Sequence, residues 1–183
     1  PAEGDGKVNF SISGENALTA NKSKLYDAMR RTALEEDAET VRKDTGWYKG
    51  KDNKWRFYIP DNEMKVVGVI GADNSATLGD YIEHNKLFAA YPELKNVNVR
   101  FGNINSTKNG EYSPENNEIV LNNKLKGDVE KLKNTLIHEI QHAIQNIEGF
   151  AVGGNRNVGF VYALNMAYDK AKNSPNFGQL ENK

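Results

Sequence analysis

Residues 128–149 read DVEKLKNTLIHEIQHAIQNIEG, and the spacing of their apolar side chains predicts one long amphipathic helix. Asp128 is a residue type that caps helix N-termini, and Gly149 stands where a C-terminal glycine belongs. At about 100° per residue, His138 and His142 fall on the side opposite the apolar stripe. That stripe consists of Val129, Leu132, Leu136, Ile140, Ile144 and Ile147. The pattern predicts a helix with one face on the core and a histidine face left for chemistry.

The histidine face carries the motif His138-Glu139-Ile140-Gln141-His142. Because the two histidines stand one helical turn apart, their ring nitrogens can reach one zinc ion at about 2.0–2.1 Å. Glu139 projects about 100° away from His138, where a carboxylate can take a proton from water that the metal activates. The motif therefore predicts a zinc site with Glu139 as the base, although the same three residues also occur by chance on solvated helical faces.

A catalytic zinc ion takes three protein ligands and keeps one open position. Glu148 lies six residues after His142, the spacing of the third ligand in metzincins, whose helix is broken by a glycine three residues after the second histidine. Gln145 takes that place here, so an unbroken helix would turn Glu148 about 120° away and leave it as a solvated carboxylate at the helix end. The third ligand therefore stays open. Gln145 itself lies on the histidine face and is a candidate to line a substrate cleft.

His84 is a further candidate for the site, as a metal ligand or a polarising group. The alternative interpretation is that His84 has a structural role, because it stands before a packed Leu-Phe pair. Ile119 and Val120 belong to a predicted strand just before the long helix. We expect this strand to be the edge that binds an extended peptide substrate as an added strand.

Apolar periodicity along the rest of the chain predicts an α+β fold. Aromatic segments on both sides of residues 51–53 predict a hairpin packed against a helix, and residues 102–117 are expected to be a polar loop. Further helices are expected at 21–43, 77–91 and 160–172, and strands at 8–12, 66–70, 97–101 and 118–121.

The chain of 183 residues suits a single domain with a core of its own. We expect a lead-in with a short strand at 1–20, one domain at 21–172 and a loose tail at 173–183.

The charges of the 24 Lys and Arg and the 25 Asp and Glu residues nearly cancel, so no broad electrostatic field favours nucleic acid or an anionic membrane as a partner. The absence of cysteine excludes thiolate ligands and nucleophiles. With no apolar run of membrane-span length and no visible signal peptide, we expect a cytoplasmic location.

Several stretches together resemble a known family, the zincin-like metallopeptidase domain of large polyvalent proteins from phages, prophages and conjugative elements. The resemblance covers about residues 22–155 and implies a small mixed or antiparallel sheet packed on the motif helix, with additional helices. It also implies a zinc cofactor and a peptide or protein substrate, taken from the polyprotein itself or from the host cell. The stretches are TGWY (45–48), KWRF (54–57), HNKLFAAYP (84–92), LIHEIQHAIQ (136–145) and EGFAVGGN (148–155).

The chain departs from this family in two places. Members often carry an acidic residue where Tyr58 stands. Beyond the loop 153–155 they usually have a Gly-Glu-x-x-Ala-Arg stretch, whose glutamate is their third zinc ligand, and this stretch is not found before Lys183. Either the chain ends short of it or the site is completed differently, with Glu181 as a conceivable substitute. The first hypothesis is a zinc-dependent metallopeptidase. The alternatives are a zincin-shaped binding or scaffold module without turnover and a structural domain without metal.

Overall fold

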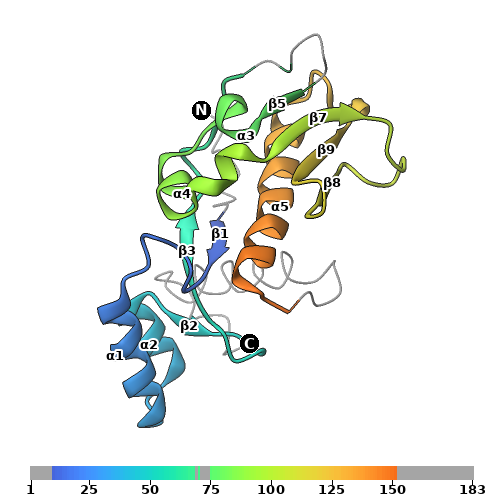
Figure 1. Cartoon of the computed structure of the whole chain (residues 1–183). Coiled ribbons are helices and arrows are strands. Elements are labelled where there is room, and N and C mark those ends of the chain that lie inside the picture. The colour runs from blue at the N-terminus through green and yellow to red at the C-terminus, as the bar shows by residue number, and fades with distance from the viewer. Residues whose placement is uncertain (1–9, 69, 71–74, 152–183) are drawn as a thin grey trace, which may run out of the picture. The chain divides into compact units, whose positions relative to one another are not determined.

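The computed structural model describes residues 10–68, 70 and 75–151 (Figure 1). The compact unit within this range runs from Val8 to Phe150, so the first strand belongs to it. The predicted helix 160–172 and tail 173–183 lie outside the described residues. In chain order the elements are β1 (Phe10–Ser13), α1 (Lys22–Ala33), α2 (Ala38–Thr45), β2 (Tyr48–Lys49), β3 (Trp55–Pro60), β4 (Lys65–Val66), β5 (Ser75–Thr77), α3 (Leu78–Tyr81), β6 (Ile82–Glu83), α4 (Asn85–Ala90), η1 (Pro92–Asn96), β7 (Asn98–Gly102), β8 (Gly110–Ser113), β9 (Glu118–Asn122), η2 (Asn123–Leu125) and α5 (Val129–Glu148).

The largest sheet has the strand order β5-β7-β9-β8. Strands β7 and β9 are parallel, and β5 and β8 flank them antiparallel, so the fold is α+β with a small mixed sheet. Strand β9 coincides with the predicted strand 118–121, but it lies inside the sheet. The edge beside it is β8, which falls within the segment 102–117 predicted to be a polar loop.

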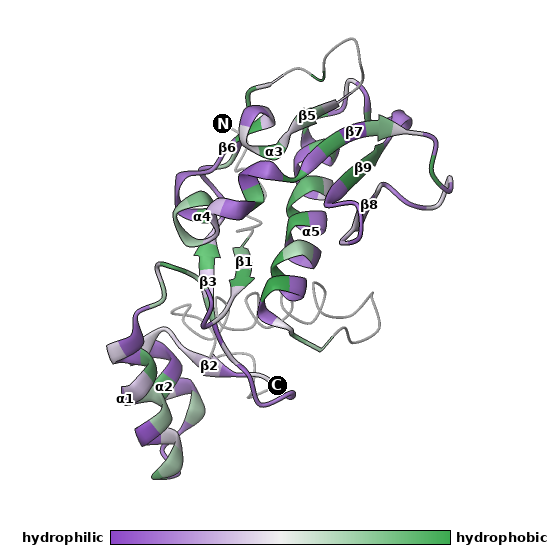
Figure 2. Cartoon of the chain, viewed as in Figure 1, coloured by the Kyte–Doolittle hydropathy of each residue, from purple (hydrophilic) through white to green (hydrophobic). Residues whose placement is uncertain are grey.

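Helix α5 packs its apolar face on this sheet and on the shorter elements around it. Leu132, Leu136, Ile140 and Ile144 are at most 5% exposed, and they share one core cluster with Val99, Ile119 and Leu121. Hydrophobic residues accordingly gather on α5, β7 and β9 in Figure 2. Val129, predicted to belong to the stripe, is instead 67% exposed, so the buried stripe begins at Leu132.

A second sheet, β1-β3-β2, contains the predicted aromatic hairpin. Strands β2 and β3 pair antiparallel, with Tyr48 opposite Arg56 and Lys49 opposite Trp55. Trp47 and Trp55 are buried against α1 and α2 in a small separate cluster with Leu25, Ala28 and Val41. The prediction that these rings form a packed layer is therefore confirmed for the two tryptophans.

Two predicted helices are each broken in the structure. The segment 21–43 forms α1 and α2, separated at residues 34–37, where Glu35 adopts the left-handed φ of 57°. Asp37 then caps α2 by accepting a hydrogen bond from the Thr40 amide. The segment 77–91 forms α3 and α4, with the short strand β6 between them. Of the described helices, none is long and apolar enough to span a bilayer.

Candidate metal centre

Helix α5 holds His138 and His142 on one face. The Asp128 side chain accepts a hydrogen bond from the Lys131 amide at 3.0 Å, and Gly149 ends the helix in the left-handed conformation, as the sequence predicts. The helix is continuous between these caps. The Nε2 atoms of the two histidines lie 3.2 Å apart, and their rings are almost perpendicular, at 89°.

The separation of these Nε2 atoms fits two ligands of one zinc ion. Two nitrogens at about 2.05 Å from a tetrahedral zinc ion stand about 3.3 Å apart. His138 is exposed and His142 half-buried, so an ion has access to the pair from solvent. A neutral imidazole pair linked by a hydrogen bond has a similar separation. The donor set and its geometry therefore suit a zinc ion at two of its coordination positions.

Among residues 10–68, 70 and 75–151, no group of three or more Asp, Glu or His side chains that could hold a metal ion is present. Glu181, the conceivable third ligand, lies outside these residues. The described part of the chain thus offers two candidate nitrogen ligands and no group of three.

Glu139 lies beneath the edge strand β8. Its side chain is 4% exposed. A Cβ added to Gly110 of β8 would lie 3.0 Å from Glu139 Oε1 and 2.7 Å from Thr135 Cγ2, so the missing side chain of Gly110 leaves room for the carboxyl group. Burial raises the pKa of Glu139 to about 7, and the main-chain N–H of Tyr112 counteracts part of this shift. A carboxyl group with that pKa can exchange a proton at neutral pH.

Ile119 and Val120 cannot serve as a substrate-binding edge. Strand β9 pairs with β7 on one side and with β8 on the other, so its main-chain groups are already paired. The two side chains are 0% and 8% exposed. That expectation was wrong because β8 is rich in polar residues, and a strand of that composition cannot be predicted from the spacing of apolar residues. Within the described residues, the sheet edge beside Glu139 is β8.

Glu148 is an internal anchor rather than a zinc ligand. Since α5 continues through residue 148, its carboxylate points away from the histidine face. It is 6% exposed and accepts hydrogen bonds from the Asn16 amide at 3.1 Å and from the Tyr91 hydroxyl at 2.7 Å. Both interpretations of Glu148 from sequence, a zinc ligand and a solvated carboxylate, were wrong. Its hydrogen-bond partners lie far away in the chain, where the helical pattern gives no information.

His84 has both ring nitrogens engaged away from α5. Its Nε2 lies 2.6 Å from Asp61 Oδ1, and its Nδ1 accepts from the Leu87 amide at the start of α4. The Ser11 hydroxyl donates to the same Asp61 carboxylate at 3.0 Å, and all three side chains are at most 2% exposed. His84 is therefore a structural residue, and the ligand and substrate roles considered from sequence are not supported by its position.

Two glutamines of α5 have defined partners, and only that of Gln145 lies within one helical turn, where periodicity can place it. Gln145 Oε1 lies 3.0 Å from His142 Nδ1. Gln141 pairs with the main chain of β1: it accepts from the Ile12 amide at 2.6 Å and donates to the Ile12 carbonyl at 3.0 Å. Gln145 thus contacts a histidine of the pair directly, while Gln141 attaches the same helix to β1.

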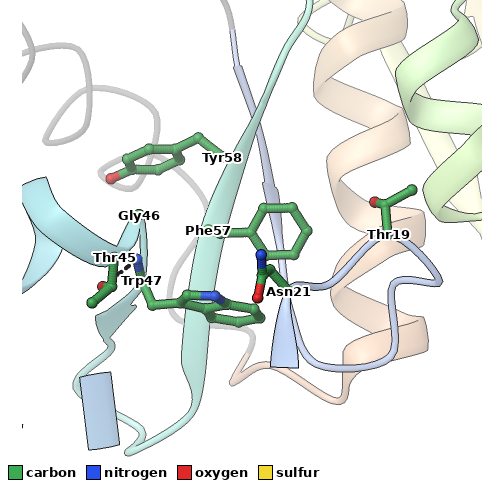
Figure 3. A pocket seen from close by; sticks show the side chains of 7 residues that line it. All are labelled: Thr19, Asn21, Thr45, Gly46, Trp47, Phe57 and Tyr58. Carbon is green, nitrogen blue, oxygen red and sulfur yellow. Dashed lines mark hydrogen bonds between the residues drawn. The ribbon is translucent and has the colours of Figure 1, made fainter. Parts of the chain in front are cut away.

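A pocket of about 270 Å³ lies elsewhere in the molecule, beside the aromatic hairpin (Figure 3). The rings of Trp47, Phe57 and Tyr58 line it, and those of Trp47 and Phe57 contact each other with centroids 4.8 Å apart and planes tilted by 56°. Thr19, Asn21 and Thr45 add polar groups. No residue of the His138–His142 pair lines this pocket, so it is separate from the candidate metal centre.

Residues 10–67 match the family described as Large polyvalent protein associated domain 23. This links the chain to large polyvalent proteins. The matched segment runs from β1 to β4 and includes the aromatic hairpin and the pocket, while the histidine pair on α5 lies beyond it. None of the curated proteins and none of the solved structures matches the chain.

Proposed function

We propose that the chain is a zinc-dependent metallopeptidase domain of a large polyvalent protein. The observation that carries the proposal is the 3.2 Å separation of His138 Nε2 and His142 Nε2 on a continuous helix, with Glu139 on the adjoining face. The family resemblance of residues 22–155 supports the same proposal from sequence, and the match of residues 10–67 supports its link to large polyvalent proteins.

His138 and His142 would hold the ion, and Glu139 would act as the base. A zinc ion, when bound, supplies a Lewis acid that polarises a peptide carbonyl and makes water more acidic. Glu139, the residue after His138, would take the proton of the attacking water and later give it to the leaving amine. An extended peptide would pair with the outer edge of β8, next to this carboxyl group.

On this proposal the partner is a peptide or protein substrate in the cytoplasm of a bacterial or phage-infected host cell. The near balance of 24 basic and 25 acidic residues gives no electrostatic reason for nucleic acid as substrate. The source of the third zinc ligand stays a prediction, with Glu181 as one candidate.

Metal analysis and peptide cleavage of the full chain test the proposal. We expect about one zinc ion per wild-type chain, retained in Glu139→Gln and lost in His138→Ala. With a pooled library of unstructured peptides read by mass spectrometry, Glu139→Gln should lower cleavage by roughly 10²-fold to 10⁴-fold, the usual contribution of a general base.

The outcomes separate the hypotheses. Wild-type protein that binds no zinc would exclude the metal site. Zinc binding without cleavage of any peptide would instead favour the zincin-shaped binding module. Full cleavage by Glu139→Gln would show that another group acts as the base.

A further inference from the structure

The ring of His142 is oriented by Gln145 on the next turn of α5. Gln145 Oε1 lies 3.0 Å from His142 Nδ1. An amide oxygen only accepts hydrogen bonds, so the proton of a neutral His142 ring sits on Nδ1. The lone pair is then on Nε2, which is the atom that faces His138.

Without metal, the two histidine rings consequently carry their protons on different nitrogen atoms. His142 Nε2 and His138 Nε2 are 3.2 Å apart, and one of them must donate if the contact is a hydrogen bond. Since the proton of His142 is on Nδ1, the donor is His138, with its proton on Nε2. A zinc ion needs lone pairs on both Nε2 atoms. His142 already presents its lone pair, and His138 does not.

We propose that Gln145 is a positioning residue that fixes His142 in its metal-binding tautomer, and that His138 alone changes tautomer when a divalent cation binds. In that change His138 Nε2 gives its proton to water and Nδ1 takes one from water, so no net proton is gained or lost. His138 is exposed, which gives its ring access to that water. The inference rests on the proposed metal site and not on peptide hydrolysis.

Nitrogen-15 spectra of the histidine rings test the tautomers directly. They are recorded on the full chain near pH 8, first metal-free and then with one equivalent of zinc. We expect the His142 proton on Nδ1 in both states, and the His138 proton to move from Nε2 to Nδ1. A His142 proton on Nε2 in the metal-free protein, or a tautomer change at both rings, would overturn the inference.

Gln145 variants test the positioning role through zinc affinity, measured by competition with a chelator. Gln145→Leu removes the acceptor, and the zinc dissociation constant should rise about 10-fold to 100-fold, as for other partners of metal-bound histidines. Gln145→Glu keeps an acceptor oxygen and should restore the affinity. Asn146→Leu, at the adjacent exposed position of α5, is the matched control and should bind zinc like wild type.

Each result of this comparison is decisive. Wild-type affinity in Gln145→Leu, or equal losses in Gln145→Leu and Gln145→Glu, would overturn the positioning role while leaving the metal site intact. Wild-type protein without zinc affinity would overturn the inference and the proposed function together. A chain that binds zinc in the predicted way but cleaves nothing would refute only the peptidase proposal.

Discussion

At the scale of single residues, neighbouring positions on α5 have opposite surroundings. His138 is exposed, while Glu139, the next residue, is buried beneath β8. Partial desolvation, together with the nearby His142, lowers the pKa of His138 and favours the neutral ring that metal ions bind. Glu148, about two and a half turns further along, is buried for a different reason, because it binds the segment after β1.

The position of Glu148 gives a prediction that separates an anchor from a ligand. Glu148→Ala leaves the buried Tyr91 hydroxyl and the Asn16 amide without their acceptor, so the free energy of unfolding should fall by about 2–4 kcal/mol. Zinc affinity should stay within about twofold of wild type, since the histidine face is unchanged. Chemical denaturation and chelator competition measure the two effects, with His142→Ala as the control that loses zinc. A tenfold loss of zinc affinity in Glu148→Ala would show that Glu148 contributes to the metal site.

At the scale of secondary-structure elements, the contact between β8 and α5 determines where Glu139 can lie. Strand β8 begins at Gly110, and the space that a side chain would fill there is taken by Thr135 and Glu139. Glycine in a strand often marks a close approach of two elements. Because residues 102–117 were predicted to be a loop, Gly110 gave no indication that β8 and α5 approach each other closely.

Gly110→Ala should therefore move the carboxyl group of Glu139 without touching the histidine pair. A misplacement of this kind can lower cleavage by about 10²-fold, and overpacking should cost about 1–3 kcal/mol of stability. Zinc stoichiometry should not change. Ser106→Ala, at an exposed position in the loop before β8, is the control and should keep wild-type cleavage. Wild-type stability and cleavage in Gly110→Ala would show that β8 does not constrain Glu139.

Local patterns in the sequence predicted α5, its two caps and the histidine face, because these features depend on residues within one or two turns. They did not predict the break between α1 and α2, where a non-glycine residue, Glu35, takes a positive φ. They also failed for side chains with distant partners. Asn16 and Glu148 are 132 positions apart, and no periodicity reports such a pair.

At the scale of the whole described unit, a buried polar cluster joins elements that are far apart in sequence. Asp61, in the loop after β3, accepts hydrogen bonds from Ser11 of β1 and from His84, which caps α4. All three side chains are withdrawn from water. Buried groups of this kind stabilise a fold only while each one keeps its partner.

Asp61→Ala removes the common acceptor and leaves two buried donors unpaired. We expect the free energy of unfolding to fall by about 3 kcal/mol, measured by urea denaturation. Glu63→Ala is the matched control in the same loop. Its side chain is 59% exposed and pairs with Lys86 at 3.3 Å, so its loss should change stability by less than about 0.5 kcal/mol. Equal effects of the two substitutions would mean that the buried cluster adds nothing.

The paired hydrogen bonds between Gln141 and Ile12 have a consequence for self-association. Among the described strands, β1 pairs with β3, and a strand edge without a neighbour is a template on which another chain can add a strand and aggregate. The Gln141 amide binds both the N–H and the C=O of Ile12 and so imitates a neighbouring strand at that residue. We therefore expect Gln141, which lies between the two histidines, to hinder the addition of a strand at Ile12.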